Sequence, residues 1–129
     1  MVSDIERKLN ITLPPEYVNS YPEIVEHSAL YFYQDDTSVP IAQFYPAIET
    51  EAVNLFSMHE TALAEELQEG MYPFAETVDG DWLCFYFDRG RLEEPQIIYV
   101  SRDQVYENQE EAIFPVASRF VDFLYMLRK

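Results

Sequence analysis

One uninterrupted hydrophobic run, Trp-Leu-Cys-Phe-Tyr-Phe at residues 82–87, is the strongest constraint on how this chain of 129 residues can fold. A run of this length suits a central strand, because a buried helix is usually at least about ten residues long. A turn signal, Asp-Gly-Asp, precedes the run at residues 79–81, and a second strand-like run, Gln-Ile-Ile-Tyr-Val, follows at residues 96–100. We therefore expect both runs to be central strands of one sheet.

Shorter runs rich in aromatic and apolar residues predict three more strands. They lie at residues 29–34, 39–45 and 72–77. The first is closed by an Asp-Asp turn at residues 35–36. The second is weakened by Pro40, because proline cannot donate a hydrogen bond to a neighbouring strand.

Two helices are expected near the N-terminus. Ser3 and Glu6 have the spacing of a capping box, in which the two side chains accept hydrogen bonds from N–H groups at the start of a helix. Asn10 suits the left-handed position that follows a helix. The pair Pro14-Pro15 predicts the start of a second helix, because proline is tolerated in the first helical turn.

Two further helices are expected later in the chain. Ser57 and Glu60 form another capping-box pattern and Gly70 can end a helix, so a helix is predicted over residues 58–69. From Pro115 onward, apolar residues recur at helical spacing and predict a last helix that packs across the sheet. The whole pattern predicts a single α+β domain over residues 1–129, with a mixed or mostly antiparallel sheet and helices packed against it.

Acidic residues outnumber basic residues by 24 to 8, which gives a formal net charge of −16. The excess is concentrated, since residues 9–88 carry fifteen Asp and Glu and no Lys or Arg. Such a chain repels nucleic acid and anionic membranes, and it attracts basic protein surfaces. The acidity is also compatible with a role in solubility alone.

Nothing in the sequence predicts secretion or membrane insertion. No stretch approaches the roughly 20 consecutive apolar residues of a membrane span. The first residues, Met-Val-Ser-Asp-Ile-Glu, contain acids and no hydrophobic segment of a signal peptide. The single cysteine, Cys84, cannot form an internal disulfide and lies within the hydrophobic run, so we expect an inert buried thiol. A reducing cytoplasm suits these features.

No motif in the sequence predicts catalysis, a metal site or a cofactor. His59-Glu60 begins like a zinc-protease motif, but Leu63 occupies the place of the second histidine. We expect His59 to lie on a helix surface or at a helix cap instead. The acidic turn at residues 79–81 lacks the further oxygen ligands of a calcium loop. Pairs of adjacent acids point apart on a helix or strand, so they do not indicate carboxylate catalysis, and we expect no enzyme.

Three segments that together span nearly the whole chain carry a family resemblance. They are Leu-Pro-Pro-Glu-Tyr at residues 13–17, Gly-Asp-Trp-Leu-Cys-Phe at residues 80–85, and Pro-Gln-Ile-Ile-Tyr-Val at residues 95–100 followed by Ser-Arg-Phe-Val-Asp-Phe-Leu at residues 118–124. In order and spacing, these segments resemble the signature of the SMI1/KNR4-like (SUKH) superfamily.

This resemblance implies a mixed or antiparallel sheet with helices packed against it, and it implies function by protein binding. Many bacterial members are immunity proteins that neutralise a toxin, often a nuclease, whereas fungal relatives act as interaction hubs. The signature is structural: we expect Gly80 to permit a turn, Asp81 to cap that turn, and Phe85 to fill the core. The signature residues with an expected structural role are Leu13, Pro14, Tyr17, Gly80, Asp81, Trp82 and Phe120.

The leading hypothesis is that this chain binds a basic toxin through acids in its loops and aromatic anchors on its strands. The candidate acids are Asp35, Asp36, Asp79, Glu93 and Glu94, and the candidate anchors are Tyr31, Tyr33 and Tyr86. The tyrosines are also compatible with half-buried core positions, since strands are rich in aromatic residues. Two other functions stay open: a regulatory adaptor without a toxin partner, and a domain that binds or converts a small molecule in a pocket.

Overall fold

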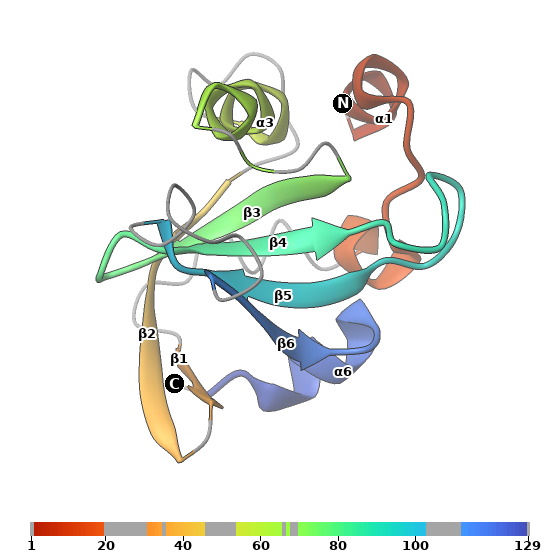
Figure 1. The fold of residues 1–129 in the computed structure, drawn as a ribbon. Helices are drawn as coiled ribbons and strands as arrows, with labels where there is room; N and C mark the ends of the chain where they lie inside the picture. The colour runs from red at the N-terminus through yellow and green to blue at the C-terminus, as the bar shows by residue number, and fades with distance from the viewer. Residues whose placement is uncertain are drawn as a thin grey trace.

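The computed structural model describes residues 2–19, 31–34, 36–45, 54–65, 67, 70–102 and 112–128. They form an α+β fold built on a curled six-stranded sheet (Figure 1), which confirms the predicted fold class. Strands β1 to β6 comprise Tyr31–Gln34, Thr37–Phe44, Met71–Thr77, Trp82–Tyr86, Gln96–Val100 and Ile113–Ala117, and helices α1, α3 and α6 comprise Val2–Leu9, Leu55–Ala64 and Phe120–Met126.

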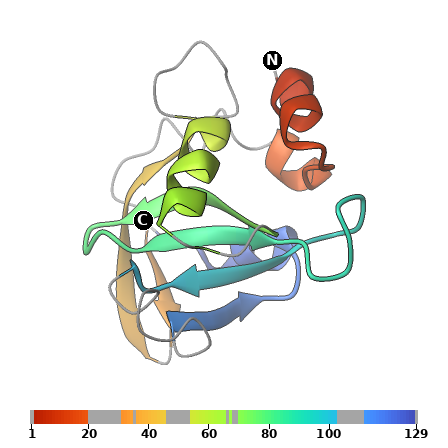
Figure 2. The ribbon, with the colours of Figure 1, turned by 45° about the horizontal axis from the view of Figure 1, so that its top comes forward.

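Neighbouring strands are antiparallel in every described pair, and the strand order follows the chain from β1 to β6. Helix α3 packs on β3, whereas α6 packs on β5 and β6 from the other side of the sheet (Figure 2). After α6 the chain returns to β1, where the backbones of Tyr31 and Arg128 exchange hydrogen bonds of 3.0 and 2.8 Å. The C-terminal segment therefore lies against the first strand.

A cluster of aromatic rings fills the core on the α6 side of the sheet. Phe74 of β3 stacks on Phe85 of β4 with 4.5 Å between ring centroids, and it contacts Phe120 and Phe123 of α6 at 5.8 and 5.6 Å. Tyr17 packs edge-on against Phe85 and Phe120. The core thus joins the N-terminal part of the chain, two central strands and the last helix.

Most residues of the family signature are buried, and a local contact with α1 holds the segment around Leu13. The Glu6 carboxylate of α1 accepts a hydrogen bond from the Leu13 N–H at 2.8 Å, which fixes the segment that leads to the second helix. Gly80 has a φ of 87°, in the left-handed region where a side chain is costly. The buried signature residues are Leu13, Pro14, Tyr17, Trp82 and Phe120.

Helix α3 begins and ends earlier than the sequence predicts. Its N-cap is Asn54: the Asn54 side-chain oxygen accepts from the Ser57 N–H, and the Ser57 hydroxyl accepts from the Asn54 N–H, both at 2.9 Å. The helix ends at Ala64, so Gly70 does not end it. The predicted range of residues 58–69 was wrong because asparagine is as good an N-cap as serine, and the actual capping box lies three residues upstream.

The start of helix α1 also differs from the prediction. The helix begins at Val2, so Ser3 lies within its first turn and does not precede it. Asn10 has a φ of 57°, which confirms the left-handed position after the last helical turn. The second predicted helix is observed from residue 15, directly after Pro14.

Strand β6 was not predicted. The sequence indicates a helix from Pro115 onward, but Ile113–Ala117 pairs with β5 and the helix begins only at Phe120. Proline is tolerated here because β6 lies at an edge of the described sheet, where a missing N–H does not interrupt pairing with a further strand. The other predicted strands agree with the structure to within two residues, except that residues 29 and 30 lie outside the described ranges.

Candidate protein-binding surface

The predicted acidic residues lie at two opposite ends of the sheet. Asp79 lies in the turn between β3 and β4, whereas Glu93 and Glu94 lie in the loop between β4 and β5. Because β4 runs from the turn to the loop, its length separates the two groups (Figure 1). The fold therefore does not bring the predicted set together as one acidic surface.

The β1–β2 hairpin extends along β2 beyond Pro40, the residue that the β3–β4 turn contacts. Gln34 pairs with Thr37, so two residues form the hairpin turn. One of them, Asp36, is exposed and has a φ of 64°, a conformation that aspartate adopts more readily than most residues. The other, Asp35, lies outside the described residues.

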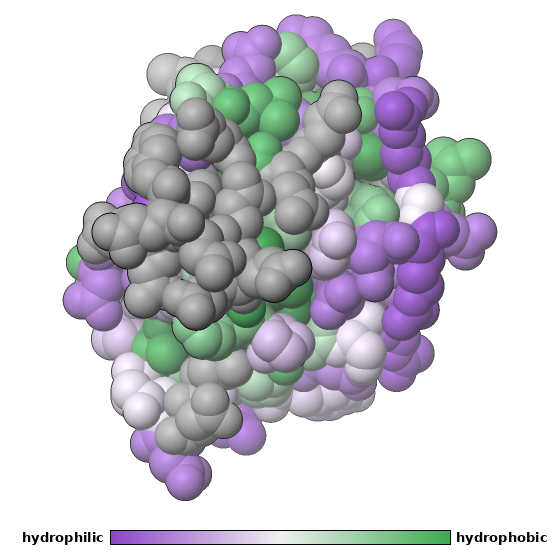
Figure 3. All heavy atoms as spheres, in the orientation of Figure 1, coloured by the Kyte–Doolittle hydropathy of each residue, from purple (hydrophilic) through white to green (hydrophobic). Residues whose placement is uncertain are grey.

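The β3–β4 turn lies beside Pro40 of β2 and exposes an apolar residue that the sequence analysis missed. The Pro40 carbonyl of β2 accepts a hydrogen bond from the Val78 N–H at 3.1 Å. Val78 is 59% exposed and directly precedes the exposed Asp79. A valine within a turn, where polar residues are usual, was the signal that could have marked it. Figure 3 shows hydrophobic and hydrophilic atoms side by side where this turn lies, at the left edge.

Tyr31 and Tyr33 lie on the outer face of β1. Side chains alternate along a strand, and Phe32 between them is buried against Phe123 of α6 with 5.7 Å between centroids. The two tyrosine rings contact each other edge-on at 5.5 Å, and their hydrogen bond raises the pKa of Tyr31. Tyr31 is half-buried, but Tyr33 is 53% exposed. We refer to the exposed side chains of Tyr33, Asp36, Val78 and Asp79 as the hairpin surface.

The other predicted residues do not join the hairpin surface. Tyr86 is half-buried at the far end of β4, where its ring lies next to Gly70. Glu93 is exposed, but its loop also carries Arg89 and Arg91, which offset most of the acidic charge. This end of the sheet is therefore a weaker candidate for contact with a basic partner.

Glu94 packs against the start of α6. It is half-buried, and its carboxylate accepts a hydrogen bond from the Phe120 N–H. Burial and the neighbouring charge of Glu16 raise the pKa of Glu94, against the opposite effect of that hydrogen bond and of Arg119. Folding raises the pKa of Glu94, so its protonated carboxyl group stabilises the fold. This stabilisation is fully present below pH 4.5, the ordinary pKa of the group, and it is lost as the pH rises through the pKa of the folded protein.

We expect Glu94→Gln to stabilise the protein at pH 7 by up to about 0.5 kcal/mol, since the site is partly exposed. Glutamine keeps an oxygen that can accept from the Phe120 N–H, but it removes the charge. Urea unfolding at pH 7 measures the gain, which should shrink at pH 4, where Glu94 is protonated. Glu93→Gln removes an exposed charge nearby and should change the stability less. A Glu94→Gln protein that is less stable than the wild type at pH 7 would contradict this interpretation.

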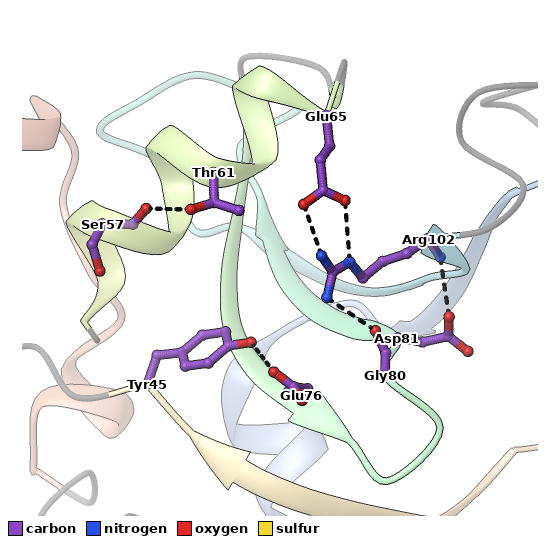
Figure 4. A network of polar contacts seen from close by, with 8 residues as sticks. All are labelled: Tyr45, Ser57, Thr61, Glu65, Glu76, Gly80, Asp81 and Arg102. Atoms are coloured by element: carbon purple, nitrogen blue, oxygen red, sulfur yellow. Dashed lines mark hydrogen bonds and ion pairs between the residues drawn. The ribbon is translucent and has the colours of Figure 1, made fainter. Parts of the chain in front are cut away.

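Arg102 connects the β3–β4 turn to the C-terminal end of α3 (Figure 4). Its Nε and Nη2 donate to the two Glu65 carboxylate oxygens at 3.3 and 2.7 Å, and its Nη1 donates to the Gly80 carbonyl at 3.4 Å. The guanidinium carbon lies over the Trp82 ring, 4.2 Å from its centroid. We call these four residues the Arg102 network, which holds the turn of the hairpin surface in place.

Asp81 bonds to the end of β5 and does not cap its own turn as expected. Its Oδ1 accepts from the Arg102 N–H at 3.0 Å, and its Oδ2 accepts from the Tyr99 hydroxyl. Burial and the hydrogen bond to Asp81 raise the pKa of Tyr99. Thr77 closes the turn instead, since its Oγ1 accepts from the Asp81 N–H at 3.2 Å and its carbonyl accepts from the Gly80 N–H at 3.0 Å.

The described residues form no arrangement that indicates catalysis. Cys84 is buried in β4, and burial raises the pKa of its thiol, which disfavours the reactive thiolate. His59 is buried rather than on the helix surface, and it stacks on Tyr72 with 4.1 Å between centroids. In the described ranges, no three His, Cys, Asp or Glu side chains gather as a metal site. No helix within those ranges has the length and apolarity to cross a membrane.

Comparison with known proteins identifies the family of the chain. The model of the SMI1 / KNR4 family (SUKH-1) matches residues 1–126. No curated protein and no solved structure matches the chain. Domains of this family generally bind partner proteins, they include immunity proteins, and they are generally not catalytic. Because the match covers nearly the whole sequence, the chain belongs to the SMI1/KNR4 family (SUKH-1).

Proposed function

We propose that this protein is a cytoplasmic immunity protein that neutralises a toxin by binding it through the hairpin surface. The observation that carries the proposal is the exposed ring of Tyr33, which stands on the same hairpin as the acidic turn at Asp36. Tyrosine is enriched among the residues that contribute most to protein–protein binding, because its ring offers a large rigid contact area. Val78 adds a second exposed apolar contact at the neighbouring turn.

Charge supports a basic partner, such as the domain of a toxin that acts on nucleic acid. The net charge of −16 attracts a positively charged surface over a long range, and Asp36 and Asp79 would direct that attraction to the hairpin surface. Arg102, which reaches the same turn, is paired with Glu65 and does not offset these acids. A nuclease must present a positive cleft to phosphate groups, so an acidic surface can occupy the same cleft.

Coexpression with any toxin-like domain that is encoded next to this chain tests the proposal directly. We expect the chain to restore growth and to copurify with the toxin at low salt, with weaker copurification at high salt. If growth is not restored and no complex forms, immunity against that toxin fails, and a role as a non-enzymatic adaptor becomes the better explanation.

Substitutions locate the contact surface. We expect Tyr33→Ser to weaken toxin binding about fivefold, which corresponds to about 1 kcal/mol. The double substitution Asp36→Asn with Asp79→Asn should slow association and reduce its salt dependence, and asparagine suits the left-handed backbone of Asp36. Isothermal titration calorimetry and stopped-flow binding measure the two effects.

Glu93→Gln is the matched control for these substitutions, because it removes one exposed acid at the opposite end of the sheet. It should leave the association rate near that of the wild type. If Glu93→Gln slows binding as much as Asp36→Asn or Asp79→Asn does, the toxin does not bind through the hairpin surface.

A further inference from the structure

A pocket of about 520 Å³ is lined by residues of α1, α3 and the β4–β5 loop. That loop lies at the opposite end of β4 from the β3–β4 turn (Figure 1). The floor of the pocket is aromatic: His59 stacks on Tyr72 at 4.1 Å, and Tyr72 meets Phe87 edge-on at 5.4 Å between centroids. Each of these three residues is less than a tenth exposed, so the floor belongs to the folded core. The volume falls in the range typical of small-molecule sites.

The rim of this pocket is basic, in a chain that is otherwise strongly acidic. Lys8 and Arg91 line it, and they are two of the eight basic residues of the protein. The Lys8 ammonium lies 4.9 Å from the centroid of the Phe56 ring. The Arg91 carbonyl accepts from the Thr12 N–H at 3.0 Å, which fixes the loop against the segment after α1.

Arg91 is one of the residues that line the pocket. It is exposed, and it forms no ion pair with any residue in the described ranges. The backbone bond to Thr12 and the φ of 129° at Gly90, a conformation that favours glycine, fix the path of the loop beside the pocket. A guanidinium group can donate two parallel hydrogen bonds to two oxygens of a carboxylate or of a sulfonate.

We propose that this pocket binds a small organic anion, with a flat apolar body on the aromatic floor and an anionic group that faces Lys8 and Arg91. The net charge of −16 disfavours the approach of anions in general, so a basic rim above an apolar floor would favour their binding at this site. Glu60 is the only acid among the described residues that line the pocket, and it opposes the bound anion.

The fluorescent dye 8-anilinonaphthalene-1-sulfonate is a suitable probe, because it joins aromatic rings to a sulfonate and becomes bright when it leaves water. We expect Arg91→Gln to weaken dye binding about three- to fivefold, as loss of one partly exposed charge contact predicts. Glu60→Gln should change the affinity in the opposite direction and tighten binding about twofold. Both side chains are exposed, so neither change should disturb the fold, which circular dichroism checks.

Two controls separate a built site from general dye adsorption. Arg89→Gln removes the same charge from the same loop, but Arg89 does not line the pocket, so the dye affinity should stay within about 1.5-fold of the wild type. The uncharged analogue N-phenyl-1-naphthylamine should bind more weakly, and its affinity should not change with any of the three substitutions. The proposal is overturned if Arg89→Gln and Arg91→Gln act alike, or if the uncharged dye responds as the sulfonate does.

This inference stands apart from the toxin-binding proposal, because the two sites share no residue. In the coexpression assay, the Arg91→Gln protein should therefore restore growth to the same extent as the wild-type protein. Tyr33→Ser should leave dye affinity unchanged. If Tyr33→Ser loses dye binding, the dye binds at the hairpin surface, and the proposal that it binds in the pocket is overturned.

Discussion

Phe74→Ala is expected to lower the free energy of unfolding by about 3–5 kcal/mol, a large share of the 5–15 kcal/mol typical of a small domain. The Phe74 ring is fully buried and contacts four other rings, from two strands and the last helix. Because these neighbours belong to different elements, they cannot close together over the vacated space, and a cavity remains. Its ring partners are Phe44, Phe85, Phe120 and Phe123.

Urea unfolding followed by the fluorescence of Trp82, the single tryptophan, measures this loss. The midpoint should fall by about 2 M if the denaturant slope is about 2 kcal/mol per M. Phe114→Ala is the control, since Phe114 is 42% exposed on the edge strand β6, and it should cost less than about 1 kcal/mol. If Phe74→Ala does not fold, Phe74→Leu should still show a loss of about 1–1.5 kcal/mol. Equal effects at Phe74 and Phe114 would contradict this account of the core.

The elements that the sequence predicted well are those whose signal is local. The run at residues 82–87 and the strand at residues 96–100 are recognisable because strands in the centre of a sheet are continuously apolar. The start of α3 was misplaced because two capping patterns stand three residues apart, and only packing decides between Asn54 and Ser57. Strand β6 was missed because Pro115 is acceptable only at a sheet edge, and the edge is a property of the whole fold.

The sequence predicted that the candidate acids lie in loops, but not where those loops lie in the fold. Asp36 and Asp79 were expected in loops, and they are, but the sequence grouped them with Glu93 because it does not show which loops share an end of the sheet. The pocket had no sequence signal, since its basic residues come from distant segments. Likewise no local pattern pairs Arg102 with Glu65, which lies 37 residues earlier.

Arg102→Met is expected to lower the free energy of unfolding by about 2 kcal/mol, through loss of the bidentate ion pair with Glu65 and of the cation–π contact with Trp82. The estimate allows for partial exposure, since the two paired side chains are 30% and 25% exposed. Methionine retains an apolar stem that can cover the Trp82 ring, so the loss reports mainly the charge and the hydrogen bonds. Unfolding should be followed by circular dichroism, because removing the guanidinium also changes the environment of the Trp82 fluorophore.

A double-mutant cycle with Glu65→Gln isolates the ion pair, and we expect a coupling of about 1 kcal/mol. Arg102→Lys keeps the charge but not the fork of donors, so its loss should lie between those of the wild type and Arg102→Met. Because the same guanidinium donates to the Gly80 carbonyl, Arg102→Met should also loosen the β3–β4 turn and weaken toxin binding at Val78 and Asp79. Zero coupling in the cycle would mean that Glu65 and Arg102 do not stabilise each other in solution.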